Sequence, residues 1–162
     1  MSLDKQGRVL DKVDLIAKIP LFSEIGAENR ELLASSSEIL KFDSGRILFR
    51  QGDVGEGAYI IISGEAEVTT EGPEGDIVVA TIGPHQFIGE IAILIDVPRT
   101  ATVTALTDLT VLMVSMEMFY RLVTGFPAIG IEVMRELARR LFKTTAQLRQ
   151  VSTDSETIEF SG

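Results

Sequence analysis

Residues 87–103 read FIGEIAILIDVPRTATV and are the most informative segment of the chain. Glu90 follows a glycine and supplies a carboxylate. After a short, mostly apolar stretch, Arg99 supplies a guanidinium and is followed by a Thr-Ala pair. Glu90 can accept a hydrogen bond from a sugar hydroxyl, and Arg99 can bind a phosphate with its bidentate fork. Small residues at Gly89 and Ala101 let backbone N–H groups approach an anion closely. The pattern predicts a site for a ligand that carries both a hydroxyl and a phosphate.

Composition limits the chemistry available elsewhere in the chain. There is no cysteine, which excludes disulfides, thiolate metal sites, iron–sulfur clusters and a cysteine nucleophile. The single histidine, His85, falls in a predicted exposed turn and cannot assemble a multi-histidine metal site. The run GDVGEG at residues 52–57 precedes a strand and lacks the Lys-Ser/Thr of a phosphate loop, so we interpret it as turns. We therefore expect no catalytic residues, no metal and no enzyme activity.

The charge balance argues against a nucleic-acid partner. The chain of 162 residues carries 15 Lys and Arg against 24 Asp and Glu, a net charge of −9. A DNA-binding domain normally has a basic footprint, and here the only basic cluster falls on a late predicted helix, where we interpret it as a solvated face. The cluster comprises Arg135, Arg139, Arg140 and Lys143. Direct DNA binding is therefore not expected.

Membrane association is not expected either. No run reaches the roughly 18 apolar residues of a membrane span, and no positively charged segment with an apolar core opens the chain. We expect a cytoplasmic protein.

Upstream and downstream of the key segment, the hydrophobic period changes. Apolar residues at helical spacing predict one helix that ends at Pro20, and a second short helix is predicted over Ala27–Ser36. We therefore expect the first 40 residues to be helical. From Ser44 to Ser115, short β-rich runs alternate with turn signals. The predicted strands are Arg46–Arg50, Ala58–Ser63, Ala66–Thr70, Ile77–Ile82, Thr102–Leu106 and Thr110–Ser115. We predict a mainly β fold with flanking helices, an antiparallel jelly roll (double-stranded β-helix), because this closure limits exposed strand edges.

The last part of the chain reads as helical. Ser115 is a good N-cap for a helix over Met116–Thr124, and Pro127 suits the first turn of a longer helix to about Gln150. Apolar residues on this helix recur at intervals of three and four, which is typical of a dimer seam. The seam is formed by Met134, Leu137, Leu141, Thr144, Leu148 and Val151. The alternative is a helix that packs back on its own barrel. Residues 151–162 are polar and acidic without a period, and we expect a mobile tail.

The ordered set of these features resembles the cyclic nucleotide-binding domain family, which includes CRP/FNR-like regulators and the regulatory subunits of cAMP-dependent protein kinase. Besides the phosphate-binding cassette at residues 87–103, the segments at residues 45–53 and 58–65 look like the glycine-containing strands and turns of that family. The resemblance covers roughly residues 19–150. It implies a cyclic nucleotide-binding domain with its C-terminal helix over 19–150, preceded by a helical segment over 1–18.

The resemblance also implies roles for individual residues. Glu90 matches the family's ribose-binding carboxylate and Arg99 its phosphate-binding arginine. The implied ligand-binding segment consists of Gly89, Glu90, Ile91, Ala92, Arg99, Thr100 and Ala101. The implied ligand is cAMP or cGMP, with no cofactor. A structural ion pair between Glu90 and Arg99 across the loop is the alternative that needs no ligand.

Two features bear on the choice of base. Thr100 follows the arginine, where some cGMP-selective relatives carry a threonine, although cAMP binders also have Ser or Thr there. Thr144 and Thr145 match the hydroxyl pair that meets the adenine amino group in the bacterial activator, one from each subunit. The other interpretation of these two threonines is a more polar part of the helical seam. We expect cAMP rather than cGMP.

The resemblance implies a cyclic nucleotide sensor, a regulatory module that dimerises through its C-terminal helix. The helix-turn-helix of a CRP-type transcriptional regulator would follow that helix, and the sequence stops soon after it. We therefore expect either a regulator lacking its helix-turn-helix or a stand-alone sensor that acts on a protein effector. The alternative function is a jelly-roll dimerisation scaffold that binds no nucleotide and contacts a protein partner.

Overall fold

The computed structural model describes residues 10–23 and 25–161. The chain divides into two compact units, Met1–Arg121 and Leu122–Gly162. The first unit contains the sheets and the predicted cassette, and the second contains most of the C-terminal helical region.

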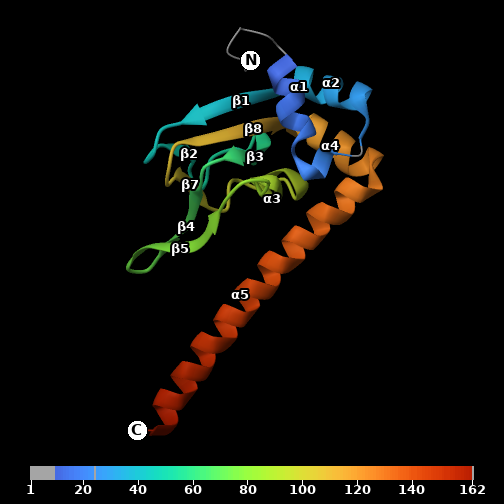
Figure 1. The fold of residues 1–162 in the computed structure, drawn as a ribbon. Helices are drawn as coiled ribbons and strands as arrows, with labels where there is room; N and C mark the ends of the chain where they lie inside the picture. Colours follow the sequence, from blue (N-terminus) through green and yellow to red (C-terminus); the bar gives the residue numbers. More distant parts are fainter. Residues whose placement is uncertain (1–9, 24, 162) are drawn as a thin grey trace. The chain divides into compact units, whose positions relative to one another are not determined.

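Short helices precede the sheets. They are α1 (Leu10–Ala17), the 3-10 helix η1 (Pro20–Phe22) and α2 (Ala27–Ser36). Pro20 restricts the residue before it, and Ile19 is indeed extended with φ −80° and ψ 117°. The prediction of α2 is confirmed at both ends, and Figure 1 shows α1 and α2 grouped beside the start of the first strand. Residues 1–9 of the expected N-terminal helical segment lie outside the described residues.

Within the described residues, two four-stranded antiparallel sheets form the jelly roll. The first has the order β1 (Ser37–Phe42), β8 (Leu109–Ser115), β3 (Gly57–Ser63), β6 (Phe87–Ile88). The second has the order β2 (Ile47–Phe49), β7 (Thr102–Ala105), β4 (Ala66–Gly72), β5 (Gly75–Ile82). The predicted mainly β fold with flanking helices is therefore confirmed.

One apolar cluster joins the inner faces of the two sheets. Alternate residues along the strands are buried, as a sheet with one covered face requires. The cluster consists of Phe49, Ile61, Ala66, Val68, Ile82, Val103, Ala105, Leu109 and Val111. This core fixes the register of the strands, because a slip of one residue would move every apolar side chain to the wrong face.

Two strands were missing from the sequence-based expectation. The expectation that the first 40 residues are helical is wrong from Ser37 onward, because Ser37–Phe42 pairs with β8 along its whole length. Pairing with a distant strand overrode a weak local preference. Strand β6 has only two residues, which is too short to show any period.

Two helices follow the sheets. Helix α4 (Met116–Gly125) begins as predicted, and the Ser115 hydroxyl accepts a hydrogen bond from the Met118 N–H at 3.2 Å. Helix α5 runs from Pro127 to Ser161, so the expected end near Gln150 is wrong. No glycine or proline occurs between Gly130 and Gly162, and nothing in the sequence stops the helix earlier. The mobility expected for residues 151–162 stays a prediction.

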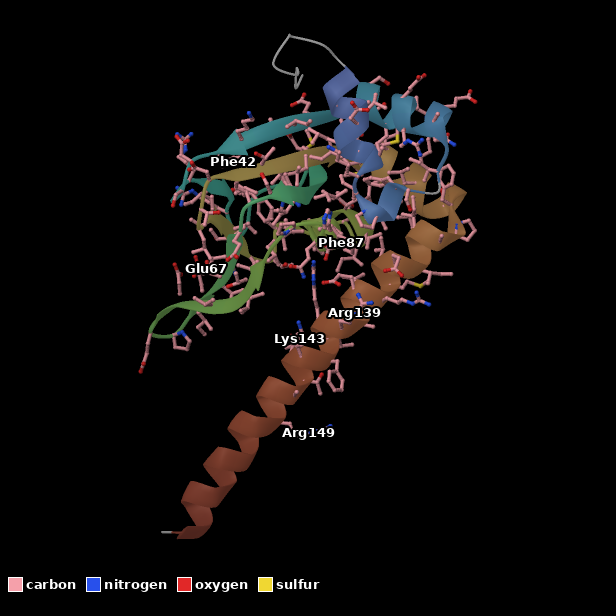
Figure 2. All side chains as sticks on the ribbon, in the orientation of Figure 1. Phe42, Glu67, Phe87, Arg139, Lys143 and Arg149 are labelled. Atoms are coloured by element: carbon pink, nitrogen blue, oxygen red, sulfur yellow. The ribbon has the colours of Figure 1, made fainter. Side chains whose placement is uncertain are left out.

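Three basic residues of α5 form ion pairs along the helix. Arg135 contacts Glu132 at 2.8 Å, and Glu136 contacts Arg139 at 3.1 Å and Arg140 at 3.4 Å. Figure 2 labels two further positions of this helix's charged surface, Lys143 and Arg149. These i,i+3 and i,i+4 pairs support the interpretation of a solvated face. In the described part of the chain, no helix is long and apolar enough to cross a membrane.

Candidate functional site

The site begins where β6 ends beside the start of β3. Tyr59 pairs with Ile88 in the antiparallel ladder, so the next residue, Gly89, lies next to the first residues of β3. Gly89 has φ +90°, a left-handed conformation that L side chains rarely adopt. The chain then turns into the short helix α3 (Glu90–Leu94). The turn brings the main chain at Gly89 close to that of Gly57.

The backbone of Arg99 is anchored to the loop that follows β2. Its N–H donates to the Asp53 carbonyl at 2.7 Å, and its own carbonyl accepts from the Gly52 N–H at 2.8 Å. Three residues further on, the Thr102 hydroxyl accepts a hydrogen bond from the Gln51 N–H at 2.9 Å. These bonds fix the main chain from which the arginine side chain extends.

The Arg99 side chain is 4% exposed, and its guanidinium contacts the main chain of both neighbouring segments. Nη1 donates to the Gly89 carbonyl at 2.8 Å, and Nη2 donates to the Gly57 carbonyl at 2.7 Å. Cζ lies 4.1 Å from the centroid of the Phe49 ring and 5.7 Å from that of Tyr59. Two carbonyls and an aromatic face therefore hold a desolvated cation, which supplies the compensation that a buried charge needs.

Electrostatics at the site follow from this burial. Desolvation lowers the pKa of Arg99, and Tyr59, Glu90 and Asp53 oppose the shift. Burial raises the pKa of Tyr59. The Arg99 cation opposes this shift, and Glu56 reinforces it. Glu90 is 1% exposed and is thus a buried carboxylate at the start of α3. The alternative of a structural ion pair stays untested, because a guanidinium with five N–H groups can bond both main-chain carbonyls and a carboxylate.

The structure brings together only part of the predicted set. Gly89, Glu90 and Arg99 meet at the junction of β3, β6 and α3, and Ala92 is buried there. Ala101 is half-buried against the core between the sheets, and Thr100 is exposed. The side chain of Ile91 lies outside the described residues.

The two predicted base-contacting threonines belong to the second unit. Thr144 and Thr145 are exposed on α5, and the Thr144 hydroxyl donates to the Arg140 carbonyl at 3.0 Å. Their role toward a base stays a prediction.

The sequence-based reasoning missed four residues that surround the guanidinium: Phe49, Gly55, Gly57 and Tyr59. A Cβ on Gly55 would lie 2.9 Å from the Ala92 Cβ and 3.1 Å from the Arg99 Cζ. The glycine spacing at residues 52–57 was a signal for a close approach, although we interpreted it only as turns. The aromatic residues gave no signal, because aromatic side chains are expected in any strand.

Comparison with known proteins agrees with the fold. The model of the cyclic nucleotide-binding domain family matches residues 39–125. A cAMP-dependent protein kinase regulatory subunit of Yarrowia lipolytica is 38% identical over 107 residues, which make up 66% of this chain and 28% of that protein. A CRP-like cAMP-activated global transcriptional regulator of Mycobacterium tuberculosis is 28% identical over 136 residues, which make up 83% of this chain and 61% of that protein.

Among solved structures, the catabolite activator protein of Thermus thermophilus matches with a TM-score of 0.70 at 28% identity. The match covers 82% of this chain and 63% of that one. The chain therefore spans less than two thirds of the length of each of these relatives.

Proposed function

Since the chain belongs to the cyclic nucleotide-binding domain family, we propose that it is a regulatory module whose cassette binds cAMP in preference to cGMP. The observation that carries the proposal is the buried juxtaposition of Glu90 and the oriented guanidinium of Arg99. A 3′,5′-cyclic nucleotide has one free ribose hydroxyl and one singly charged phosphodiester. Glu90 accepts the hydrogen bond of the 2′-hydroxyl, and Arg99 binds the phosphate.

The donor inventory of Arg99 fits this role. A guanidinium carries five N–H groups, and the carbonyls of Gly89 and Gly57 take one from each terminal nitrogen. Each terminal nitrogen has a second N–H, and two such donors match the two unesterified oxygens of a phosphodiester. One cation balances one negative charge, whereas a nucleoside triphosphate would require further cations.

The preference for cAMP rests on Thr144 and Thr145, whose hydroxyls would meet the adenine amino group across a dimer. Thr100 beside the arginine is the feature that would instead suit cGMP. If the alanine variants of both helical threonines bind cAMP as tightly as the wild type, the base assignment loses its support.

A homodimer along α5 completes the proposal. Met134 and Leu141, seven residues apart on the predicted seam, are 62% and 68% exposed. Exposed apolar residues at this spacing are what a partner helix covers. The proposed dimer is a cytoplasmic sensor that acts on a protein effector. A CRP-type transcriptional regulator is the second candidate, because a relative of that kind matches the chain.

Helix α4 is the element through which the cassette would signal. The Tyr120 hydroxyl on α4 donates to the Ile93 carbonyl of α3 at 2.7 Å. Ligand capture that shifts α3 would therefore pull on α4, which leads into α5. The proposed module signals by binding and is not an enzyme.

The test is isothermal titration of the protein with cAMP, cGMP, 2′-deoxy-cAMP and 5′-AMP. We expect cAMP to bind at micromolar concentration or tighter, cGMP to bind more weakly, and 5′-AMP, with its additional charge, to bind weakest. 2′-Deoxy-cAMP should lose affinity in the wild type and lose nothing further in Glu90→Gln, because the variant lacks the same interaction. No binding of any of the four ligands would rule out the sensor and leave the scaffold.

A further inference from the structure

Phe49 lies at the end of β2 and belongs to the core cluster between the sheets, yet its ring also lies against the Arg99 guanidinium. Cζ of Arg99 is 4.1 Å from the ring centroid, well inside the roughly 6 Å range of a cation–π interaction. The ring of Tyr59 is 5.7 Å from that of Phe49 and tilted by 30° against it. An aromatic pair therefore links the guanidinium to the core.

The orientation of a guanidinium requires more than hydrogen bonds at its two terminal nitrogens. The carbonyls of Gly57 and Gly89 fix two points of its edge and the Cδ–Nε bond ties the group to its side chain, so tilting of its plane is left to contacts on its face. A ring over Cζ restrains this tilting, because attraction to the π face is greatest when the cation stays over the ring. The close approach of Gly55 leaves room for the guanidinium at the same place.

We propose that Phe49 is a positioning residue for ligand binding: its ring, which lies over the Arg99 Cζ, restrains the orientation in which the guanidinium meets the phosphate. The inference rests on the proposed function, since it concerns the same site. Burial makes the contribution substantial, because cation–π interactions are stronger for a desolvated cation than at an exposed surface. The electron density of the ring, and not only its volume, therefore sets the affinity for a cyclic nucleotide.

The test changes the ring electronics at nearly constant volume. Phe49 is replaced in the full-length chain by 4-fluoro-, 3,5-difluoro- and 3,4,5-trifluorophenylalanine, and the Kd for cAMP is measured by isothermal titration. Fluorine withdraws density from the ring face, so we expect the Kd to rise stepwise along the series, to about tenfold for the trifluoro ring. The matched control is the same series at Phe22, which is 1% exposed and lies in η1. We expect no trend there.

A second measurement does not depend on binding. The aromatic ring current should shift the Arg99 side-chain NMR signals upfield in the wild type, and Phe49→Leu should reduce the shift to what the more distant Tyr59 ring contributes. Binding of cAMP by the unmodified chain with a flat series at Phe49, or equal trends at Phe49 and Phe22, would overturn the positioning role and leave the proposed function intact. Failure of the unmodified chain to bind cAMP would remove the proposed function and, with it, this inference.

Discussion

Gly89 offers a test of how the site positions its cation. Gly89 and Gly45 both have φ +90°, so alanine imposes the same backbone strain at each, about 1–2 kcal/mol. Their surroundings differ. A Cβ at Gly45 would have nothing within 4 Å, whereas one at Gly89 would lie 2.5 Å from Nη1 and 3.3 Å from Cζ of Arg99. The pair thus separates the effect of strain from that of displacing the guanidinium.

The expected loss of cAMP affinity in Gly89→Ala follows from these contacts. To restore ordinary van der Waals distance, the guanidinium of Arg99 must move by about 1 Å. Such a shift breaks the 2.8 Å bond to the Gly89 carbonyl and misaligns the donors offered to a phosphate. Truncating one member of a buried hydrogen-bonded charge pair costs about 2–5 kcal/mol, and we expect the displacement in Gly89→Ala to cost about the low end of that range, a rise of about 30-fold in the Kd for cAMP.

Two assays read the two effects. Thermal unfolding should show that Gly45→Ala lowers the melting temperature by about 2–4 °C per kcal/mol of strain, and Gly89→Ala by at least as much. Isothermal titration with cAMP should show wild-type affinity in Gly45→Ala and the large loss in Gly89→Ala. If the two variants bind cAMP equally well, the position of the Arg99 guanidinium does not control binding, and the reasoning is refuted.

Three further predictions concern signalling, pH and assembly. Tyr120→Phe removes the hydroxyl that bonds α3, so the cAMP-dependent change in amide hydrogen exchange over residues 116–125 should shrink; an unchanged difference would argue against this link. Lys12 donates to the Ser37 carbonyl, and burial lowers its pKa below 10.5 while Glu38 opposes the shift, so its folded state releases the proton first. Relative to Lys12→Met, the wild-type free energy of unfolding should rise as pH increases from the lowered pKa towards 10.5, and a fall in urea titrations would contradict the assignment. Leu141→Glu should convert the dimer to a monomer in light scattering, whereas a wild type that is already monomeric would contradict the seam.

Much of this architecture could be predicted from the sequence, because the relevant signals are local. Turn glycines at Gly52 and Gly64 have φ +92° and +93°, conformations that only glycine adopts readily, and they separate strands near their observed ends. The N-cap at Ser115 and the charged residues of the cassette are likewise local signals.

The remaining features depend on contacts between distant segments. The pairing of Ser37–Phe42 with β8 cannot be read from a six-residue stretch. The contact of the Phe49 ring with Arg99 joins a strand residue to a distant loop residue, and nothing in the sequence around Phe49 distinguishes it from another core aromatic. The end of α5 was misplaced for a different reason: an amphipathic period that fades does not itself terminate a helix, and no Gly or Pro follows Gly130 until Gly162.

The most direct test of the central claim is the affinity for cAMP of the wild type and of Arg99→Leu, measured side by side by isothermal titration. Leucine puts an apolar side chain in the buried position of Arg99 and removes the cation. We predict micromolar or tighter binding by the wild type and a Kd raised at least about 30-fold in the variant. Equal affinities would contradict the assignment of Arg99 as the phosphate-binding residue, and the absence of binding by the wild type would contradict the sensor itself.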